Sequence, residues 1–511
     1  MSRSLFARLH RRYGTRLSGL DRRRELSQRL EIYRAASALD FTESIHKGGR
    51  RGPNVAVIGA GFAGLMAAWT LAGRATVTVF EARARVGGRV HSLVDDITKR
   101  ITEAGGELIG YAHPTWLTLA RRFELGLVVW TSDSDFDALK LESPTYIKGH
   151  RLSDAETEHV YDEMNAAFLA MAKDAEAIHD PERPWLADHA DALDNRPLSD
   201  WIDKQPCSTF TKDALELQFA NTNAAPSTRQ SYLANLALVA GARRPGGAPD
   251  DFFTMSENAR CARGNQALAE ALGADIKRRG GALHLSNPIR KIEILPEKVH
   301  VTPAAGAAPI EYDFAILAIP PSLWPAANPD LHITPAIPAE YYMTMGTAVK
   351  YLSRAATRFW IAQSLAPSAT SDRCGMLWEG TDNQMQAPHQ DIELSLFAGG
   401  DAAGQALAAF THGHADGVRK HYDERINEIY PSYAQHRRDA TQFIAWPLDP
   451  WTRAGYSCPA PGDVRRAGPL LTAPYEKRLY FAGEHTCPPF FGYMEGALQS
   501  GARTAHAILS L

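Results

Sequence analysis

Three glycines near the start of the chain have the spacing of a site that holds a dinucleotide. Gly59, Gly61 and Gly64 directly follow an apolar run at residues 55–58. In such a site the first glycine permits a tight turn, the second lets the backbone approach a pyrophosphate, and the third lets a helix pack on a strand. Glu81 lies about twenty residues further on, where an acid accepts hydrogen bonds from ribose hydroxyls.

These residues can act together only if a strand, a helix and a second strand position them. Residues 55–58 lack polar alternation, which is typical of a strand buried on both faces of a parallel sheet. A helix from Leu65 would direct its N-terminal amides at the pyrophosphate, and a second strand at residues 76–80 leads into Glu81. This order predicts a dinucleotide-binding domain. A glycine-rich turn in another α/β domain is the alternative.

The composition excludes several classes of protein. The 511 residues are 45% apolar and 22% charged with a formal net charge of −3, which is ordinary for a globular enzyme and unsuited to recruiting nucleic acid. No apolar run approaches the roughly 18 residues of a transmembrane helix, so no such helix is expected. No signal peptide is evident either, and we expect a cytoplasmic protein. The 5 cysteines are scattered without a zinc spacing, which favours free thiols and no metal site.

Residues 1–53 are rich in arginine. No apolar segment follows the arginine pairs, so a twin-arginine export signal is not expected. Four apolar side chains near helical spacing predict a helix that packs on the surface of the main body: Leu20, Leu26, Leu30 and Tyr33. A basic patch for a partner is the alternative, although Asp21, Glu25 and Glu31 dilute its charge.

The middle of the chain predicts a helical region followed by further strands. Residues 117–257 are expected to be mostly helical, with an acidic amphipathic helix at 155–175 and one short strand at 145–147. Because this region holds no second dinucleotide motif, we interpret it as an inserted substrate-side domain. Further strands are expected at residues 288–293, 299–302 and 312–319.

Motifs at both ends of the chain resemble those of the flavin-dependent amine oxidase family, which includes monoamine oxidases, polyamine oxidases and L-amino-acid oxidases. They are the glycine fingerprint, Arg85-x-Gly87-Gly88-Arg89, and the closing Phe481-Ala-Gly-Glu484 with Gly492-Tyr-Met-Glu-Gly-Ala. The resemblance covers about residues 54–511. Within the family, Glu107-Leu-Ile-Gly110 followed by His113-Pro-Thr-Trp116 looks most like bacterial L-amino-acid oxidases.

The resemblance implies an α/β fold with a Rossmann-like, doubly wound FAD-binding domain, an inserted α+β substrate-binding domain and an N-terminal helical extension. The extension would comprise residues 1–53. The FAD-binding domain would be assembled from residues 54–116, 258–340 and 453–511, and the substrate domain from residues 117–257 and 341–452.

The resemblance also implies FAD as the cofactor. Its adenosine half would lie against Glu81 and Arg83, its adenine against the backbone of Ile289, and its ribityl end beside Arg89 and Glu484. A surface salt bridge is the alternative for Arg89, and a helix cap is the alternative for Glu484. The full set of residues expected to bind the cofactor is Gly59, Gly61, Phe62, Ala63, Gly64, Glu81, Ala82, Arg83, Gly87, Gly88, Arg89, Gly106, Glu107, Ile289, Gly483, Glu484, Gly492, Tyr493 and Met494.

Three residues match the family's catalytic positions, namely Lys350, Tyr456 and Tyr493. The resemblance implies that the two tyrosines form an aromatic cage for the amine and that Lys350 bonds a water beside flavin N5. Trp451 would form part of the substrate-binding wall, and Trp446 would also pack near the flavin. The alternatives are core tyrosines with bonded hydroxyls, a strand lysine that extends to solvent, and tryptophans in an ordinary core.

The chain departs from the family pattern at two positions. Some monoamine oxidases attach FAD to a cysteine immediately before the first cage tyrosine, whereas this position is Gly455 here and Cys458 lies three residues too late. We therefore expect non-covalent FAD. Many L-amino-acid oxidases place an arginine for the substrate carboxylate where this chain has Leu108. Either another residue binds the carboxylate, or the substrate has none.

The resemblance implies an FAD-dependent oxidase that uses oxygen and releases hydrogen peroxide. We expect oxidative deamination of L-amino acids to 2-oxo acids and ammonia, and oxidation of primary amines or polyamines is the alternative. An FAD-dependent desaturase and a flavin-binding sensor without turnover are more distant alternatives. The expected partners are the small-molecule substrate and oxygen, and a homodimer is kept open as the assembly.

Overall fold

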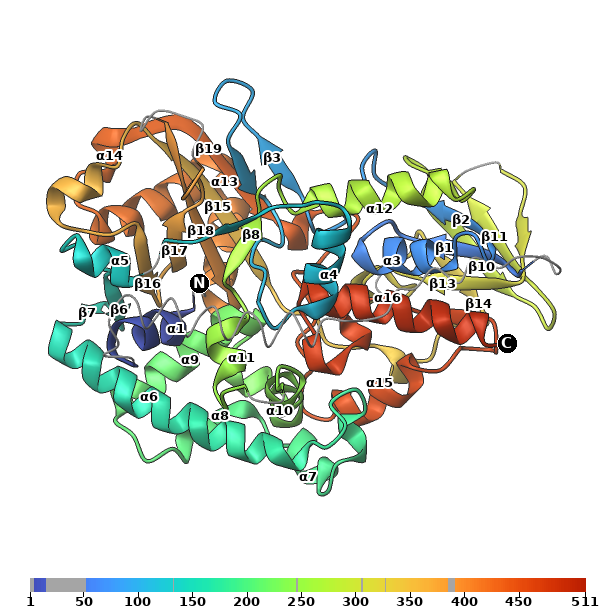
Figure 1. Cartoon of the computed structure of the whole chain (residues 1–511), viewed down its shortest axis with the longest axis horizontal. Coiled ribbons are helices and arrows are strands. Elements are labelled where there is room, and N and C mark those ends of the chain that lie inside the picture. Colours follow the sequence, from blue (N-terminus) through green and yellow to red (C-terminus); the bar gives the residue numbers. More distant parts are fainter. Residues whose placement is uncertain are drawn as a thin grey trace.

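The computed structural model describes residues 4–14, 52–131, 133–244, 247–304, 307–326, 328–384 and 391–511. Figure 1 shows one lobe built around the β1–β2 sheet, a second lobe built around the β15–β18 sheet, and a layer of helices along one side. No helix in the described residues combines the length and the hydropathy needed to cross a membrane.

The first lobe is organised by a five-stranded sheet in the order β20-β13-β1-β2-β9. All of its strand pairs are parallel. Its strands are β1 (Asn54–Ile58), β2 (Thr76–Phe80), β9 (Ala282–His284), β13 (Phe314–Leu317) and β20 (Leu479–Phe481). Three helices pack with this sheet in one hydrophobic core, namely α3 (Phe62–Leu71), α12 (Gln266–Arg278) and α16 (Met494–Leu509). The predicted α/β fold with a parallel cofactor-binding sheet is confirmed.

A smaller sheet lies against the same lobe, in the order β12-β11-β10-β14. Its strands are β10 (Ile289–Ile294), β11 (Val299–Pro303), β12 (Ile310–Tyr312) and β14 (His332–Thr334). The strand predicted at residues 312–319 is present as β13 over residues 314–317, but Tyr312 belongs to β12, because the chain changes sheet at Asp313. The Asp313 carboxylate accepts the backbone N–H of Asn54 at 2.7 Å and pairs with Lys298 at 2.9 Å, which separates β12 from β13.

The second lobe contains a seven-stranded mixed sheet in the order β19-β15-β18-β17-β16-β6-β7. Its strands are β6 (Thr145–Ile147), β7 (His150–Arg151), β15 (Ala348–Ala355), β16 (Ser368–Ser371), β17 (Gly375–Glu379), β18 (Ile392–Gly399) and β19 (Arg437–Ala445). The long helix α13 (Gly400–Ile429) shares a hydrophobic core with β15 and β18. Two short ladders, β3 (Ser92–Val94) with β4 (Ile101–Glu103) and β5 (Leu127–Val129) with β8 (Ala259–Cys261), connect the lobes.

The predicted helical region carries most of the remaining helices. They are α4 (Pro114–Arg122), α5 (Asp133–Ala138), α6 (Asp154–Asp174), α7 (Ala190–Asp194), α8 (Leu198–Asp203), α9 (Thr209–Asn223), α10 (Tyr232–Gly241) and α11 (Asp251–Met255). A capping box between Ser153 and Glu156 starts α6, close to the predicted position. The strand β5 was missed, because three apolar residues become a strand only when β8 pairs with them. Later in the chain lie α14 (Tyr433–His436) and α15 (Asp463–Leu471).

The described part of the N-terminal extension is a core element. Helix α1 (Leu5–Leu9) and a π-helical turn (His10–Gly14) lie against α6, and Phe6 is fully buried. Its ring packs edge-on against Phe168 and Phe253. The surface helix predicted through Leu20, Leu26, Leu30 and Tyr33 lies outside the described residues.

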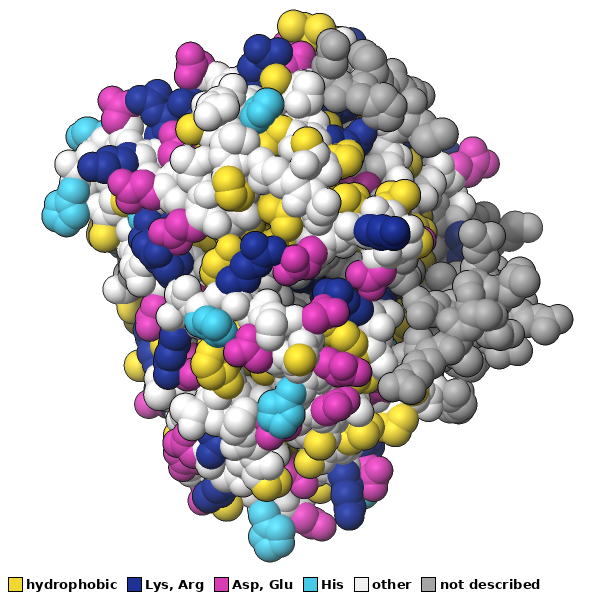
Figure 2. All heavy atoms as spheres, turned by 90° about the vertical axis from the view of Figure 1, so that its left-hand side faces the viewer, with side chains coloured by type: hydrophobic (Ala, Val, Ile, Leu, Met, Phe, Trp, Pro, Cys, Tyr) yellow, Lys and Arg dark blue, Asp and Glu magenta, His cyan; other side chains and the backbone are white. Residues whose placement is uncertain are grey.

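Basic and acidic side chains are interspersed on the face drawn in Figure 2. A surface of this kind offers no single-sign field to a polyanion. The mixture of basic and acidic side chains described on this face is consistent with the small net charge of the chain.

Candidate functional site

The main cavity lies at the carboxyl ends of β1, β13 and β20, where parallel α/β sheets bind ligands. Residues 61–63, 318–320 and 483–485 line it from the first lobe, directly after those three strands. Strands β15, β17 and β18 line it from the second lobe through Lys350, Trp378, Phe397 and their neighbours. The cavity therefore requires segments from nearly the whole length of the chain.

The glycine loop has the geometry that its spacing predicts. Gly59 has a φ of +105°, and a Cβ on Gly64 would lie 1.9 Å from the Gly59 carbonyl oxygen. Both positions therefore require glycine for the turn and for close packing of α3 on β1. A Cβ on Gly61 would meet no atom within 4 Å, so this residue faces open space at the first turn of α3. Backbone amides at a helix N-terminus favour an anion there.

Glu81 and Arg83 lie at the end of β2, outside the lining of the main cavity. The Glu81 carboxylate accepts the backbone N–H groups of Ala60 and Arg83, each at 2.8 Å. It therefore fixes the glycine loop. The Arg83 guanidinium pairs with Asp449 and donates to the Thr452 hydroxyl at 2.9 Å.

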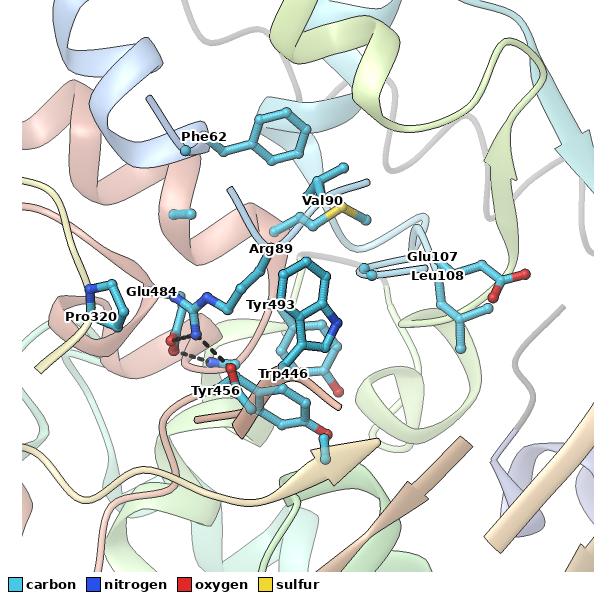
Figure 3. Close-up of a pocket in the computed structure, with 18 of the residues that line it drawn as sticks. Phe62, Arg89, Val90, Glu107, Leu108, Pro320, Trp446, Tyr456, Glu484 and Tyr493 are labelled. Carbon is cyan, nitrogen blue, oxygen red and sulfur yellow. Dashed lines mark hydrogen bonds and ion pairs between the residues drawn. The ribbon is translucent and has the colours of Figure 1, made fainter. Parts of the chain in front are cut away.

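A partly buried ion pair joins Arg89 to Glu484 at 2.8 Å (Figure 3). Arg89 also donates to the Gly455 carbonyl oxygen at 3.0 Å, and Glu484 accepts the Gly492 N–H at 2.7 Å and both the N–H and the hydroxyl of Ser457. Burial alone would raise the pKa of Glu484, but Arg89 and these donors lower it below its usual value. The carboxylate is therefore ionised, and its partners differ from those of a simple helix cap.

Three aromatic rings gather beside this ion pair, those of Trp446, Tyr456 and Tyr493 (Figure 3). The Tyr456 hydroxyl donates to the Thr222 carbonyl oxygen at 2.9 Å, and its ring leaves no room for a Cβ on Gly492. Burial raises the pKa of both tyrosines, so their hydroxyls stay neutral. The rings thus form an apolar wall, and the polar atoms of these side chains point towards protein groups.

Lys350 is buried in the cavity wall and does not extend to solvent. Its Nζ lies 2.6 Å from Glu107 Oε2 and donates to the Glu103 carbonyl oxygen at 2.9 Å. The side chain of Glu107 is only 2% exposed. Two residues that sequence analysis assigned to different roles therefore form one ion pair.

Residues 62–509 match the family of flavin-containing amine oxidoreductases. The chain belongs to this family. The flavin-containing amine oxidase A of Canis lupus familiaris is 26% identical over 477 residues, which cover 89% of this chain and 85% of that protein. The flavin-containing amine oxidase of Danio rerio is 25% identical over 480 residues, with the same coverage.

Solved structures share the fold of this amine oxidoreductase. A putrescine oxidase bound to putrescine has a TM-score of 0.74 at 20% identity and covers 90% of this chain and 99% of its own. Cyclohexylamine oxidase from Brevibacterium oxydans gives the same values. The family prediction is confirmed, whereas these similar proteins are amine oxidases and do not single out L-amino-acid oxidases.

FAD is the cofactor of flavin-containing amine oxidoreductases, and the cavity suits it. The open space at Gly61 lies at the N-terminus of α3, where the pyrophosphate would meet backbone amides. The wall beyond it is apolar and aromatic, which suits a flavin ring. Bound FAD would supply the oxidising chemistry, because no protein side chain accepts a hydride.

The structure brings most of the predicted site residues to one cavity. Those that line it are Gly61, Phe62, Ala63, Gly87, Arg89, Gly106, Glu107, Lys350, Tyr456, Gly483, Glu484, Gly492, Tyr493 and Met494. Those that lie outside its lining are Gly59, Gly64, Glu81, Ala82, Arg83, Gly88, Ile289 and Trp451.

Trp451, which was expected in the substrate-binding wall, does not line the cavity, whereas Trp446 does. Trp446 directly follows β19, and its indole N–H donates to the Ala104 carbonyl oxygen at 3.1 Å. The chain then turns at Asp449, whose carboxylate accepts the Trp451 N–H at 2.9 Å. This turn leaves Trp451 outside the cavity lining.

Several residues that line the cavity of the amine oxidoreductase were not predicted from the sequence. They are Asn221, Thr222, Glu257, Pro320, Met376, Trp378 and Phe397. The first two end α9 in a polar Asn-Thr-Asn stretch, which was the available signal. The others belong to strands and loops with no distinctive local motif.

Proposed function

We propose that this amine oxidoreductase oxidises amines that carry no α-carboxylate. The observation that carries the proposal is that both cations of the described cavity wall already have a carboxylate partner. Arg89 pairs with Glu484, and Lys350 pairs with Glu107. Burial lowers the pKa of the neighbouring His485 to about 4, so it is neutral near pH 7.

A substrate carboxylate buried in this cavity would therefore meet only cations whose charge a protein carboxylate already neutralises. Burying an unpaired carboxylate is costly, and a bidentate arginine is a strong partner that offsets this cost. Leu108 stands where the family resemblance would place such an arginine, and it lines the cavity. The names of the similar proteins point the same way, since they specify amines, putrescine and cyclohexylamine.

In this proposal the amine lies between Tyr456 and Tyr493, whose rings can face a nitrogen with their π surfaces. With FAD bound, the cofactor would supply the two-electron oxidation of the amine to an imine at the expense of oxygen, which would become hydrogen peroxide. Water would then hydrolyse the imine to a carbonyl compound and ammonia. The protein orients the amine and excludes water from the reacting atoms. The cofactor-binding residues proposed in the cavity and beside it are Gly61, Phe62, Ala63, Gly87, Gly88, Arg89, Gly106, Gly483, Glu484, Gly492, Tyr493 and Met494. Gly59, Gly64, Glu81, Ala82, Arg83 and Ile289 are proposed towards the adenosine end.

Anaerobic mixing of the FAD-loaded protein with amines and with the matching L-amino acids tests the substrate class. We expect primary amines such as putrescine and cyclohexylamine to bleach the visible band of the oxidised flavin, and the amino acids to leave it unchanged. Bleaching by amino acids alone would contradict the proposal and establish L-amino-acid oxidation, the second candidate. A flavin that stays oxidised with every compound would contradict both.

We also propose that FAD is bound without a covalent link. A Cβ on Gly455 would lie 2.9 Å from both the Cβ and the N of Ala348, so the position next to Tyr456 has no room for a flavin-linked cysteine. Cys458 is fully buried and does not line the cavity. Acid precipitation should therefore release all of the flavin into the supernatant. Flavin that remains with the precipitated protein after washing would contradict this prediction.

A further inference from the structure

Glu107 joins four separate elements at the wall of the cavity. It follows β4, and its Oε2 lies 2.6 Å from Nζ of Lys350 on β15. Its other oxygen accepts the indole N–H of Trp378 on β17 at 3.1 Å. The same oxygen lies 4.0 Å from Nη1 of Arg260 on β8. A residue that merely touched the flavin would not need this set of contacts.

The cluster is buried, so each charge in it depends on the others. The side chains of Glu107 and Arg260 are each 2% exposed, and that of Lys350 is 6% exposed. The Arg260 guanidinium also donates to the carbonyl oxygens of Gly380 and Asp382. In a low-dielectric wall, removing one partner leaves an uncompensated charge. Glu107 therefore holds Nζ of Lys350 at a defined position, together with the Glu103 carbonyl oxygen.

The hydrogen bonds of Lys350 leave one donor for the cavity. An ammonium group has three N–H donors. Glu107 Oε2 accepts one and the Glu103 carbonyl oxygen accepts another, at 2.9 Å. The Trp378 ring lies on a further side, 5.5 Å from Nζ. Since Lys350 lines the cavity, the third N–H is available to a group held there.

We propose that Glu107 is a positioning residue for Lys350 in the oxygen half of the reaction. The inference rests on the proposed oxidase function. A fixed ammonium stabilises the negative charge that develops on oxygen as it accepts electrons. Glu107 contributes by holding that ammonium in place. This positioning role takes the place of the cofactor-binding role that was expected from the sequence.

The test separates the two halves of the reaction in FAD-loaded protein. Glu107→Gln should slow reoxidation by oxygen about tenfold or more, while the rate of flavin reduction by an amine changes less than about twofold. Glu107→Asp should restore part of the oxygen rate, because it retains the charge. Reoxidation at the wild-type rate in Glu107→Gln would overturn the inference. An equal loss in both halves would also overturn it.

A matched control distinguishes positioning from general loss of stability. Glu379 is a second buried carboxylate, 2% exposed, that pairs with Arg358 at 2.7 Å and does not line the cavity. Glu379→Gln should reduce stability without changing the ratio of the two half-reaction rates. If it slowed reoxidation as selectively as Glu107→Gln does, the inference would fail.

Chemical reduction tests the role of Glu107 even if the proposed substrate class is wrong. Dithionite reduces the flavin without an amine, and exposure to oxygen then gives the reoxidation rate of the wild type and of Glu107→Gln. A failure of the proposed substrate class is therefore seen separately.

Thermal unfolding of the flavin-free protein tests the coupling of Glu107 and Lys350 without any measurement of activity. The Glu107→Gln/Lys350→Met double variant should unfold at a higher temperature than either single variant. Additive losses would show that the two residues are not coupled and would overturn the inference.

Discussion

Replacing Gly61 by valine should leave the protein folded and abolish flavin binding. Gly61 has extended backbone angles, φ −73° and ψ 176°, which valine adopts readily. A Cβ there meets no protein atom within 4 Å, so the added methyl groups would occupy only the space assigned to the pyrophosphate. We expect the dissociation constant of FAD to rise at least about 100-fold, equivalent to roughly 3 kcal/mol.

The measurement is titration of flavin-free protein with FAD, followed by fluorescence, together with circular dichroism and thermal unfolding. Gly404→Val is the matched control, because a Cβ on Gly404 also meets nothing within 4 Å but lies on α13, away from the cavity. The control should bind FAD as the wild type does. A yellow, stoichiometrically loaded Gly61→Val protein would refute the placement of the cofactor.

Replacing Glu484 by alanine should have the second large effect, because this carboxylate holds both cage tyrosines indirectly. It accepts the N–H of Ser457, the residue after Tyr456, and the N–H of Gly492, the residue before Tyr493. Its loss would also leave the Arg89 guanidinium without its carboxylate. Because Arg89 is partly exposed, breaking the pair should cost about 3 kcal/mol of unfolding free energy, the low end of the range for buried pairs. Displacing both rings should lower the rate of flavin reduction by amine about 100-fold.

Urea unfolding and stopped-flow reduction check this prediction. Glu495→Ala is the control, since Glu495 is fully buried and accepts the N–H groups of Thr115 and Trp116, but does not line the cavity. Glu495→Ala should be less stable than the wild type. The fraction of this variant that binds FAD should be reduced by amine at the wild-type rate. Wild-type reduction kinetics in Glu484→Ala would show that this carboxylate does not organise the cage.

The pH dependence of stability provides an independent check on Glu484. Its pKa in the folded protein lies below the value of 4.5 that an unperturbed glutamate has. Because the folded pKa is lowered, ionised Glu484 stabilises the protein above pH 4.5, and this contribution is lost as the pH falls through the folded pKa. The difference in unfolding free energy between wild type and Glu484→Gln should therefore narrow as the pH falls below about 4.5.

Local sequence motifs were not sufficient to predict the substrate class. The segment after Gly106 resembles L-amino-acid oxidases in sequence, yet the charges that meet in the cavity favour an amine. Leu108 was visible in the sequence as a missing arginine. Only the folded chain shows that Arg89 and Lys350, the cations expected in the site, each already pair with a carboxylate.

The sequence by itself determined the nucleotide-binding strand, the glycine loop and the family, because each depends on neighbouring residues. The turn at Gly59, the close contact at Gly64 and the apolar run of β1 are constraints within a few residues, so spacing alone expresses them. Only the tertiary structure decided which charges meet. Lys350 and Glu107 are 243 residues apart in the chain, and Arg89 and Glu484 are 395 apart. Such pairs form because folding brings distant segments of the chain together, and a contact of that kind has no local signature in the sequence.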